Sequence, residues 1–241
     1  MPKASPPQDW IHQIYHVPIY SIADASRYLH IPVPTLKTWL TGRSYPTKMG
    51  KKDFTPLIQR PNPDVSQLSF TNLVEAHVLR VIRTEHKIAL DKVRLALDYM
   101  SEQFQTPHPL VQKQFQTDGA DLFLDQIDHL INVSRSGQLA IREILKNLLT
   151  RVEWNEEDIA ARLFPFVETS LAENIPKILT IDPNISFGKP TITGTGIPTK
   201  IVTELYDSGD DLAQIATDYN CTEAQIQTAI LFESKFKPLA A

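Results

Sequence analysis

Cysteine is almost absent from this chain of 241 residues. Cys221 is its one thiol, which excludes an internal disulfide and a metal site built from cysteines. A chain without disulfides fits a reducing compartment, so we expect a cytoplasmic protein. No run approaches ~18 uninterrupted apolar residues, and the N-terminal residues lack the apolar stretch of a signal peptide. We therefore expect neither a membrane span nor a secretion signal.

Patterns of catalytic and metal-binding residues are also lacking. The seven histidines form no HExxH motif and no cluster with cysteine. The glycine-rich segment 188–196 is not a phosphate-binding loop, because its lysine precedes the later glycines instead of following them. We therefore expect a protein that is not an enzyme and that uses no metal or cofactor.

Charge is spread unevenly along the chain, although the formal net charge is only −4. Residues 1–100 hold 13 Lys and Arg against 8 Asp and Glu, a net charge of +5. Residues 101–241 hold 11 against 20, a net charge of −9. A basic region joined to an acidic one is typical of a nucleic-acid-binding module that carries a protein-interaction module.

The basic region opens with the pattern of two short helices. Ser21 and Asp24 have the spacing of a capping box and predict a helix that ends before the sequence HIPV. A second helix is expected over 33–40, where Pro34 is acceptable because first-turn amides need no intrahelical partner. Its apolar face consists of Leu36, Trp39 and Leu40. Two short helices joined by a tight turn form a helix-turn-helix.

The polar side of the second helix and the segment after it carry the candidate DNA contacts. Short polar side chains can reach base edges, and cations can bind phosphates. Residues 42–60 predict a β-hairpin wing with a basic tip around Gly50. We expect DNA contacts from Thr35, Lys37, Thr38, Thr41, Arg43, Lys48, Lys51 and Lys52.

The residues after the wing predict two helices and then a small mixed module. Ser69 begins a helix over 69–82, and another runs over 89–104, both with apolar faces. The turn residues Thr117-Asp118-Gly119 predict a hairpin within 110–126. Further expected elements are a strand and turn over 129–141, a short amphipathic helix over 141–152 and an edge strand over 161–167.

The last part of the chain combines glycine turns with three helices. Gly188 and Gly194 can take a positive φ, while Pro190 and Pro198 restrict the chain beside them. Helices are expected over 199–208, 211–219 and 222–236, with Gly209 after the first of them. We assign structural-turn or partner-binding roles to Gly188, Lys189, Pro190, Gly194, Thr195, Gly196 and Pro198.

An internal repeat links the two ends of the chain. Residues 21–40 align without gaps with residues 211–230, and five apolar positions coincide. The polar surfaces differ, because the first copy carries Lys37 where the second carries Gln227 beside Glu223. We therefore predict a second helix-turn-helix whose acidic surface does not bind DNA and serves a different partner.

The first copy resembles a known family of regulators. Residues 21–40, SIADASRYLHIPVPTLKTWL, resemble the winged helix-turn-helix of MerR-type regulators, and residues 68–100 resemble the helices that follow the wing in that family. One position departs from the family pattern. Pro32 stands where the usual serine caps the second helix, and proline provides no capping oxygen.

The C-terminal part resembles a second family. Residues 181–202, IDPNISFGKPTITGTGIPTKIV, resemble the C-terminal domain of VapB-type antitoxins, with its Gly-Lys/Arg-Pro and Gly-Thr-Arg/Gly-Ile/Val-Pro hallmarks. Gly196 stands where many members carry Arg, so no role of that arginine is transferred. With a middle segment similar to that of the longer members, the resemblance covers roughly residues 20–237. The hallmark positions are Asp182, Pro183, Gly188, Lys189, Pro190, Gly194, Thr195, Gly196, Ile197 and Pro198.

The second resemblance implies an antitoxin that represses its own operon through operator DNA and neutralises a PIN-like ribonuclease toxin. We expect a homodimer, because operators mirror two-fold protein symmetry. The alternative is a stand-alone MerR-like transcription regulator whose middle module senses a ligand. We expect a mainly helical α+β fold divided into an arm (1–18), a winged helix-turn-helix (19–105), a small α+β middle module (106–176) and an antitoxin-type domain (177–241).

Overall fold

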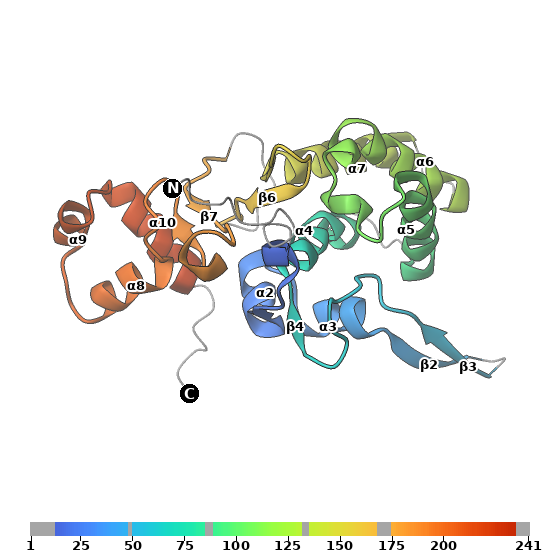
Figure 1. Cartoon of the computed structure of the whole chain (residues 1–241), viewed down its shortest axis with the longest axis horizontal. Helices are drawn as coiled ribbons and strands as arrows, with labels where there is room; N and C mark the ends of the chain where they lie inside the picture. The colour runs from blue at the N-terminus through green and yellow to red at the C-terminus, as the bar shows by residue number, and fades with distance from the viewer. Residues whose placement is uncertain (1–12, 48–49, 85–88, 132–134, 168–174, 235–241) are drawn as a thin grey trace, which may run out of the picture. The chain divides into compact units, whose positions relative to one another are not determined.

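A computed structural model of the chain describes residues 13–47, 50–84, 89–131, 135–167 and 175–234 (Figure 1). The chain divides into two compact units. The first comprises residues 1–150 with 154–160, and the second comprises residues 151–153 with 161–241. Each unit has its own set of buried apolar side chains.

The expected helix-turn-helix opens the first unit. Helices α2 (Ile22–Leu29) and α3 (Val33–Thr41) are joined by a tight turn. The predicted cap of α2 is present, because Ser21 Oγ accepts the N–H of Asp24 at 3.0 Å and donates to the Asp24 carboxylate at 2.7 Å. Strand β1 (Tyr20–Ser21) pairs with β4 (Gln67–Leu68), which brings the chain back beside α2 after the wing.

Part of the expected N-terminal arm belongs to the core of this unit. Residues 1–12 lie outside the described residues, whereas residues 13–16 are helical. Tyr15 is 5% exposed, and its ring centroid lies 5.9 Å from that of Phe70. The hydroxyl of Thr71 donates to the Tyr15 carbonyl at 3.1 Å. This end of the arm is therefore held by tertiary contacts that its aperiodic sequence did not indicate.

Helix α4 (Phe70–Thr84) lies at the centre of the first unit. It begins where expected, because Ser69 Oγ accepts the N–H of Asn72 at 3.2 Å. Phe70, Val74 and Val78 form its apolar face and are buried. The opposite side is buried as well and carries polar residues: Thr71, Asn72, Glu75, His77 and Arg80. A helix buried on all sides must satisfy those polar groups internally.

The middle of the chain is helical where we expected a hairpin and a strand, so that expectation is wrong. Helix α5 (Leu90–Phe104) is followed by two short helical turns and two long helices. These elements are the 3₁₀ turn η1 (Pro109–Val111), the π-helical turn η2 (Phe115–Gly119), α6 (Ala120–Ile131) and α7 (Arg135–Leu149). The helix expected over 141–152 is therefore the second half of a longer one.

Gly119 explains the wrong expectation for the hairpin. It has helical backbone angles instead of the turn conformation that Thr-Asp-Gly indicates. A Cβ at this position would lie 2.7 Å from Cζ of Phe104, closer than real Cβ contacts come. The glycine therefore leaves room for the Phe104 ring of α5 and does not serve a positive φ.

The second unit contains the predicted turns and three predicted helices. Its strands are short, and β7 pairs antiparallel with β8. Gly209 follows α8 with φ 105°, as expected for a residue just past a helix end. The elements that lie wholly or mostly in this unit are β5 (Val152–Trp154), β6 (Ala160–Leu163), β7 (Leu179–Thr180), η3 (Ser186–Gly188), β8 (Thr191–Ile192), α8 (Thr199–Asp207), α9 (Leu212–Asp218) and α10 (Glu223–Ser234).

A buried arginine holds the start of the second unit. The guanidinium of Arg151 donates to the carbonyl oxygens of Phe164 at 2.9 Å, Pro165 at 3.2 Å and Ile175 at 2.6 Å. Burial lowers the pKa of Arg151 to about 10, so the side chain stays charged at neutral pH. These charge-assisted bonds connect the end of β6 with the segment around Ile175.

The described residues form a mainly helical α+β fold, as predicted, with four two-stranded sheets. The wing is one of these sheets, formed by β2 (Arg43–Thr47) and β3 (Gly50–Phe54). None of the helices described is both long enough and apolar enough to cross a bilayer.

Candidate nucleic-acid interface

The turn between α2 and α3 fixes how α3 leaves the core. His30 adopts the left-handed conformation with φ 53°. The N–H of Ile31 donates to the Ser26 carbonyl at 3.1 Å, and the buried Ile31 side chain holds the turn against the core. Pro32 begins α3 without a side-chain cap, as its sequence predicted, but its carbonyl accepts the N–H groups of Thr35 and Leu36.

The buried side of α3 anchors the helix. Leu36, Trp39 and Leu40 are at most 1% exposed, as expected from their spacing. The Trp39 carbonyl also accepts N–H groups from Leu57 at 2.8 Å and Ile58 at 3.1 Å. The chain that returns from the wing is thus hydrogen-bonded to the end of α3. The position of the wing base therefore depends on the position of α3.

The opposite side of α3 carries the predicted polar contacts. Lys37 and Thr41 are exposed, and Thr35 and Thr38 are half-buried. Thr38 Oγ1 donates to the Pro34 carbonyl, and Thr41 Oγ1 donates to the Lys37 carbonyl, both at 2.9 Å. Because each of these two hydroxyls donates within the helix, its lone pairs are left to accept hydrogen bonds from a ligand.

The wing follows α3 along the chain and contains further cationic residues. The strand register pairs Lys51 with Pro46 and Lys52 with Tyr45. The side chains of Arg43, Lys51 and Lys52 lie outside the description, and Lys48 lies outside the described residues altogether. The exposed Ser44 and Asp53 are hydrogen-bonded across the strands. Strand positions are therefore established for Arg43, Lys51 and Lys52, and their contacts with DNA stay predictions.

A chain of buried hydrogen bonds supports this region and was missed by the sequence analysis. Asn72 Nδ2 donates to the Gln59 carbonyl at 2.8 Å and to Glu75 Oε2 at 3.0 Å. The other carboxylate oxygen, Glu75 Oε1, lies 2.9 Å from Nδ1 of His108. The network joins the segment after the wing to α4 and to the chain before η1. Its only sequence signal is the polar pair Asn72 and Glu75, three residues apart in α4.

His108 is the titratable member of that network. Burial lowers the pKa of its imidazole, but the hydrogen bond and the negative charge of Glu75 outweigh burial, so the net pKa is raised. The pair is a protonated imidazole bound to a buried carboxylate at moderately acidic pH. The network therefore loses its charge pairing as the pH rises.

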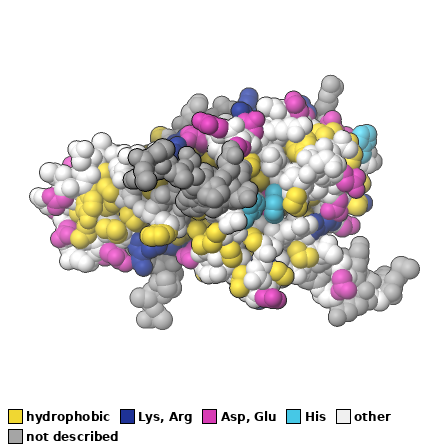
Figure 2. Space-filling model, viewed as in Figure 1, with side chains coloured by type: hydrophobic (Ala, Val, Ile, Leu, Met, Phe, Trp, Pro, Cys, Tyr) yellow, Lys and Arg dark blue, Asp and Glu magenta, His cyan; other side chains and the backbone are white. Residues whose placement is uncertain are grey.

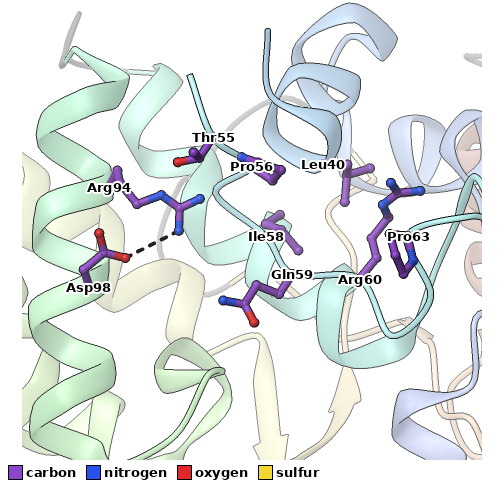
Figure 3. A pocket seen from close by; sticks show the side chains of 9 residues that line it. All are labelled: Leu40, Thr55, Pro56, Ile58, Gln59, Arg60, Pro63, Arg94 and Asp98. Atoms are coloured by element: carbon purple, nitrogen blue, oxygen red, sulfur yellow. Dashed lines mark ion pairs between the residues drawn. The ribbon is translucent and has the colours of Figure 1, made fainter. Parts of the chain in front are cut away.

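A groove lies behind α3 in the first unit. Its volume is about 460 Å³, and its lining includes the end of α3, the segment after the wing and α5. Figure 3 shows Arg94 and its ion-pair partner Asp98 on one side, Arg60 on the other, and Ile58 between them. Arg94 Nη1 lies 3.5 Å from Asp98 Oδ1. The groove combines apolar walls with two guanidinium groups.

The glycine turns of the second unit are held together by side-chain hydrogen bonds. Asp182 Oδ1 accepts the N–H of Asn184 at 2.8 Å, while Arg162 donates to Asp182 Oδ2 at 2.8 Å. Ser186 Oγ donates to the Gly196 carbonyl at 2.7 Å. The positive φ that we expected occurs at Gly188 (72°) and Gly194 (81°).

The remaining predicted residues of this segment differ in exposure. Lys189 and Thr195 are exposed, Pro190 is buried, and Gly196 and Pro198 are half-buried. Thr195 Oγ1 donates to the Ile192 carbonyl at 2.8 Å and accepts the N–H of Ile197 at 3.0 Å. These bonds give Thr195 a structural part in the turn.

Helices α9 and α10 repeat the geometry of α2 and α3. Asn220 is left-handed with φ 51°, at the position that matches His30. The N–H of Cys221 donates to the Ala216 carbonyl at 2.9 Å, which matches the bond between Ile31 and Ser26. Burial alternates in the same order along α10 and α3, except that Ile230 is half-buried where Leu40 is buried. The internal repeat therefore exists in three dimensions.

Comparison with known proteins assigns both ends of the chain. A family model described as a "putative DNA-binding HTH domain" matches residues 18–97. A second model, described as a "protein of unknown function (DUF433)", matches residues 179–232. The first match covers the helix-turn-helix, the wing and α4, and the second covers the turn segment with α8 to α10.

Two proteins of Mycobacterium tuberculosis are similar over most of the chain. One is named "Putative antitoxin VapB45" and is 27% identical over 233 residues, which cover 90% of this chain and 94% of the relative. The other is named "Uncharacterized protein Rv2308" and is 22% identical over 228 residues, 91% of each chain. The crystal structure of Rv2018 from the same organism shares the fold, with a TM-score of 0.65 and 23% identity over 90% of this chain and 99% of that one.

These findings define the class. Residues 18–97 match a helix-turn-helix family that is described as putatively DNA-binding, and nearly the whole chain is similar to a protein named as a putative antitoxin. The comparisons point to a regulatory protein and away from an enzyme. Among the described residues, no cluster of His, Cys, Asp and Glu has the composition of a metal site.

Proposed function

We propose that this protein is an antitoxin that represses its own operon and neutralises a PIN-like ribonuclease toxin. The observation that carries the proposal is the α2–α3 pair, whose rigid turn presents Lys37 and Thr41 on the exposed side of α3. A MerR-like winged helix-turn-helix places such a face against base edges and its wing against the neighbouring backbone. Repression requires a homodimer if the operator is two-fold symmetric.

Toxin neutralisation is assigned to the second unit. Residues 177–241 hold eight Asp and Glu against five Lys and Arg. A ribonuclease presents cations to RNA, so an acidic partner associates with it quickly and blocks that surface. On the face shown in Figure 2, carboxylates lie along the left and lower edges of an apolar patch over the part formed by α8 to α10, and Lys or Arg side chains lie at its lower right. A VapB-type turn segment beside this surface supports the assignment.

Co-expression with the product of the neighbouring gene tests the proposal. The full chain should co-purify with that product, and the purified pair should shift DNA from the upstream region of the operon. The isolated partner should degrade RNA, and addition of the full chain should stop the degradation. The antitoxin proposal fails if the full chain neither binds the neighbouring product nor protects RNA from it.

A stand-alone regulator that responds to a small molecule is the second candidate. The groove behind α3 favours it, because a ligand there would contact Leu40 at the end of α3 and the segment hydrogen-bonded to Trp39. Its two guanidinium groups suit a small anion with an apolar body. Operator affinity that changes with such a ligand, without any bound partner protein, would favour this candidate.

A further inference from the structure

Phe187 is the most exposed large apolar side chain among the described residues, at 90%. Such exposure of a phenylalanine leaves its apolar area in water, which is unfavourable. Other exposed large apolar residues reach at most 60%, the value for Leu139. The position of Phe187 therefore calls for a physical reason beyond the stability of the unit.

The backbone at Phe187 is also unfavourable. Ser186 has φ 49° and Phe187 has φ 56°, which places both in the left-handed region that favours glycine. Gly188 follows with φ 72°, where such a value costs little. Two consecutive non-glycine residues in this conformation persist only where the surroundings hold them, and such strain concentrates at functional sites.

Hydrogen bonds on both sides of Phe187 hold this conformation. Ser186 Oγ donates to the Gly196 carbonyl at 2.7 Å, and the Gly188 N–H donates to the Ile185 carbonyl at 3.0 Å. The segment begins at Asp182, which is 4% exposed and is paired with Arg162. The backbone is thus fixed by bonds that do not involve the Phe187 ring, and the ring is presented to solvent from a defined position.

We propose that Phe187 is the anchor residue with which this protein binds its toxin, inserted into an apolar pocket of that partner. This inference rests on the antitoxin function proposed above. An aromatic side chain on a fixed backbone is a favourable anchor, because little conformational entropy is lost when it binds. The strain at Ser186 and Phe187 is then the cost of holding the anchor ready.

The formal charge of the segment that contains Phe187 guides the choice of occupant. The excess of carboxylates in residues 177–241 repels nucleic-acid phosphate, so DNA and RNA are disfavoured as occupants. A second copy of the same acidic unit is disfavoured by like charge. A ribonuclease with a cationic RNA-binding surface has the complementary charge. The toxin therefore fits this surface better than the other candidates do.

Binding of the full chain to the neighbouring gene product tests the anchor. Phe187→Ala should raise the dissociation constant for the toxin by about 30-fold or more, the effect expected for an interface anchor. Leu139→Ala is the matched control, since it removes an exposed apolar side chain from the first unit, and it should change the constant by less than about threefold. Operator affinity should be the same for both variants and the unaltered chain.

Phe187→Gly separates the ring from the backbone. It removes the aromatic group and relieves the positive-φ strain, so its thermal midpoint should equal or exceed that of the unaltered chain, while toxin binding should be lost as in Phe187→Ala. If Phe187→Ala folds poorly, Phe187→Gly still tests whether the ring of Phe187 binds the toxin.

Two results would overturn the inference and tell it apart from the proposed function. If the unaltered chain binds the toxin and Phe187→Gly binds it equally well, the anchor is wrong and the antitoxin function stands. If the unaltered chain itself does not bind the neighbouring product, the antitoxin function and the anchor fail together.

Discussion

The helix-turn-helix formed by α2 and α3 and the one formed by α9 and α10 have the same backbone and different surfaces. Both begin at a capped helix and turn through a left-handed residue, His30 in the first and Asn220 in the second. Both bury matching positions of the second helix, Leu36 in the first copy and Ile226 in the second. The apolar positions therefore specify the fold of a helix pair and say nothing about its partner.

The partner is specified by the exposed positions. At the centre of the exposed side, α3 carries Lys37 and α10 carries Gln227, and α10 begins with Glu223 where α3 begins with Val33. Cations favour a phosphate backbone, whereas carboxylates repel it. We therefore predict that the first helix pair binds DNA and that the second has a different partner, which under the proposed function is the toxin.

Truncation of the matching core residues should have the largest effect. Leu36 and Ile226 are both 0% exposed, so Leu36→Ala or Ile226→Ala should lower the free energy of unfolding of its own unit by about 2–5 kcal/mol. Hydrogen exchange measured by peptide mass spectrometry should show the faster exchange in the unit that carries the change. Leu36→Met, which keeps the volume, should cost less than about 1.5 kcal/mol. If Ile226→Ala also loosened α2 and α3, the two copies would not be independent.

Removal of the polar contacts of α3 should have the next largest effect, on DNA alone. Lys37→Ala combined with Arg43→Ala should weaken operator binding several-fold to about 100-fold, since each good contact is worth about 1–3 kcal/mol. Gln227→Ala is the matched change in the second copy and should leave operator binding unchanged in a gel-shift titration. A loss of operator binding with Gln227→Ala would show that the second copy contacts DNA.

The wing should contribute to DNA affinity through its charge more than through recognition of the base sequence. Lys51→Ala should weaken binding to operator and to random DNA by the same factor, because a phosphate contact carries no base information. The slope of log K against log salt should fall in magnitude by about 1. Filter binding over a range of salt concentrations measures both quantities. A change confined to the operator would mean that Lys51 reads bases.

Replacing the capping residue of the second helix should change the free energy of unfolding differently in the two copies, by a smaller amount than the changes above. Thr222 caps α10, since its Oγ1 accepts the N–H of Gln225 at 3.2 Å, whereas Pro32 offers α3 no such oxygen. Thr222→Ala should therefore lower the free energy of unfolding of the second unit by about 1 kcal/mol. Pro32→Ala should remove no cap, and its effect on the first unit should be smaller than that of Thr222→Ala on the second. Urea unfolding of each variant measures the difference.

The smallest expected effect is a pH dependence in the stability of the first unit, which contains His108 as well as the first helix pair. The raised pKa of His108 means that the folded chain binds this proton more tightly than the unfolded chain. The contribution to stability is fully present below the unfolded pKa of about 6.5 and is lost as the pH rises through the folded pKa. The free energy of unfolding of the first unit, measured with urea, should thus fall from mildly acidic to alkaline pH. His108→Gln should remove that dependence. An equal dependence in His108→Gln would contradict this assignment.

Local patterns were sufficient for the elements that depend on neighbouring residues. The Ser21 cap, the Ser69 cap, the apolar face of α3 and the wing were all predicted, because each depends on residues a few positions apart. The positive φ of Gly188 and Gly194 was expected for the same reason. Of the predicted DNA contacts, the structure places Lys37 and Thr41 on an exposed face and leaves the side chains of the wing lysines undescribed.

Other features depended on contacts that no local pattern reveals. The hairpin around Gly119 was wrongly predicted, because glycine occurs both where φ is positive and where another side chain comes close, and only the position of Phe104 distinguishes the two. The network of Asn72, Glu75 and His108 joins residues up to 36 positions apart, each of which looks like a surface residue in isolation.

Local sequence patterns were enough to predict two helix pairs of equal apolar pattern and opposite surface charge, since burial periodicity and formal charge are properties of nearby residues. Tertiary structure decided what each polar or small residue does there. Glu75 is buried because α4 is covered on all sides, and Phe187 is exposed because the bonds of Ser186 and Gly188 hold its backbone. The physical reason is the same in both cases. The free energy of a buried charge or an exposed ring depends on groups that the chain brings together only when it folds.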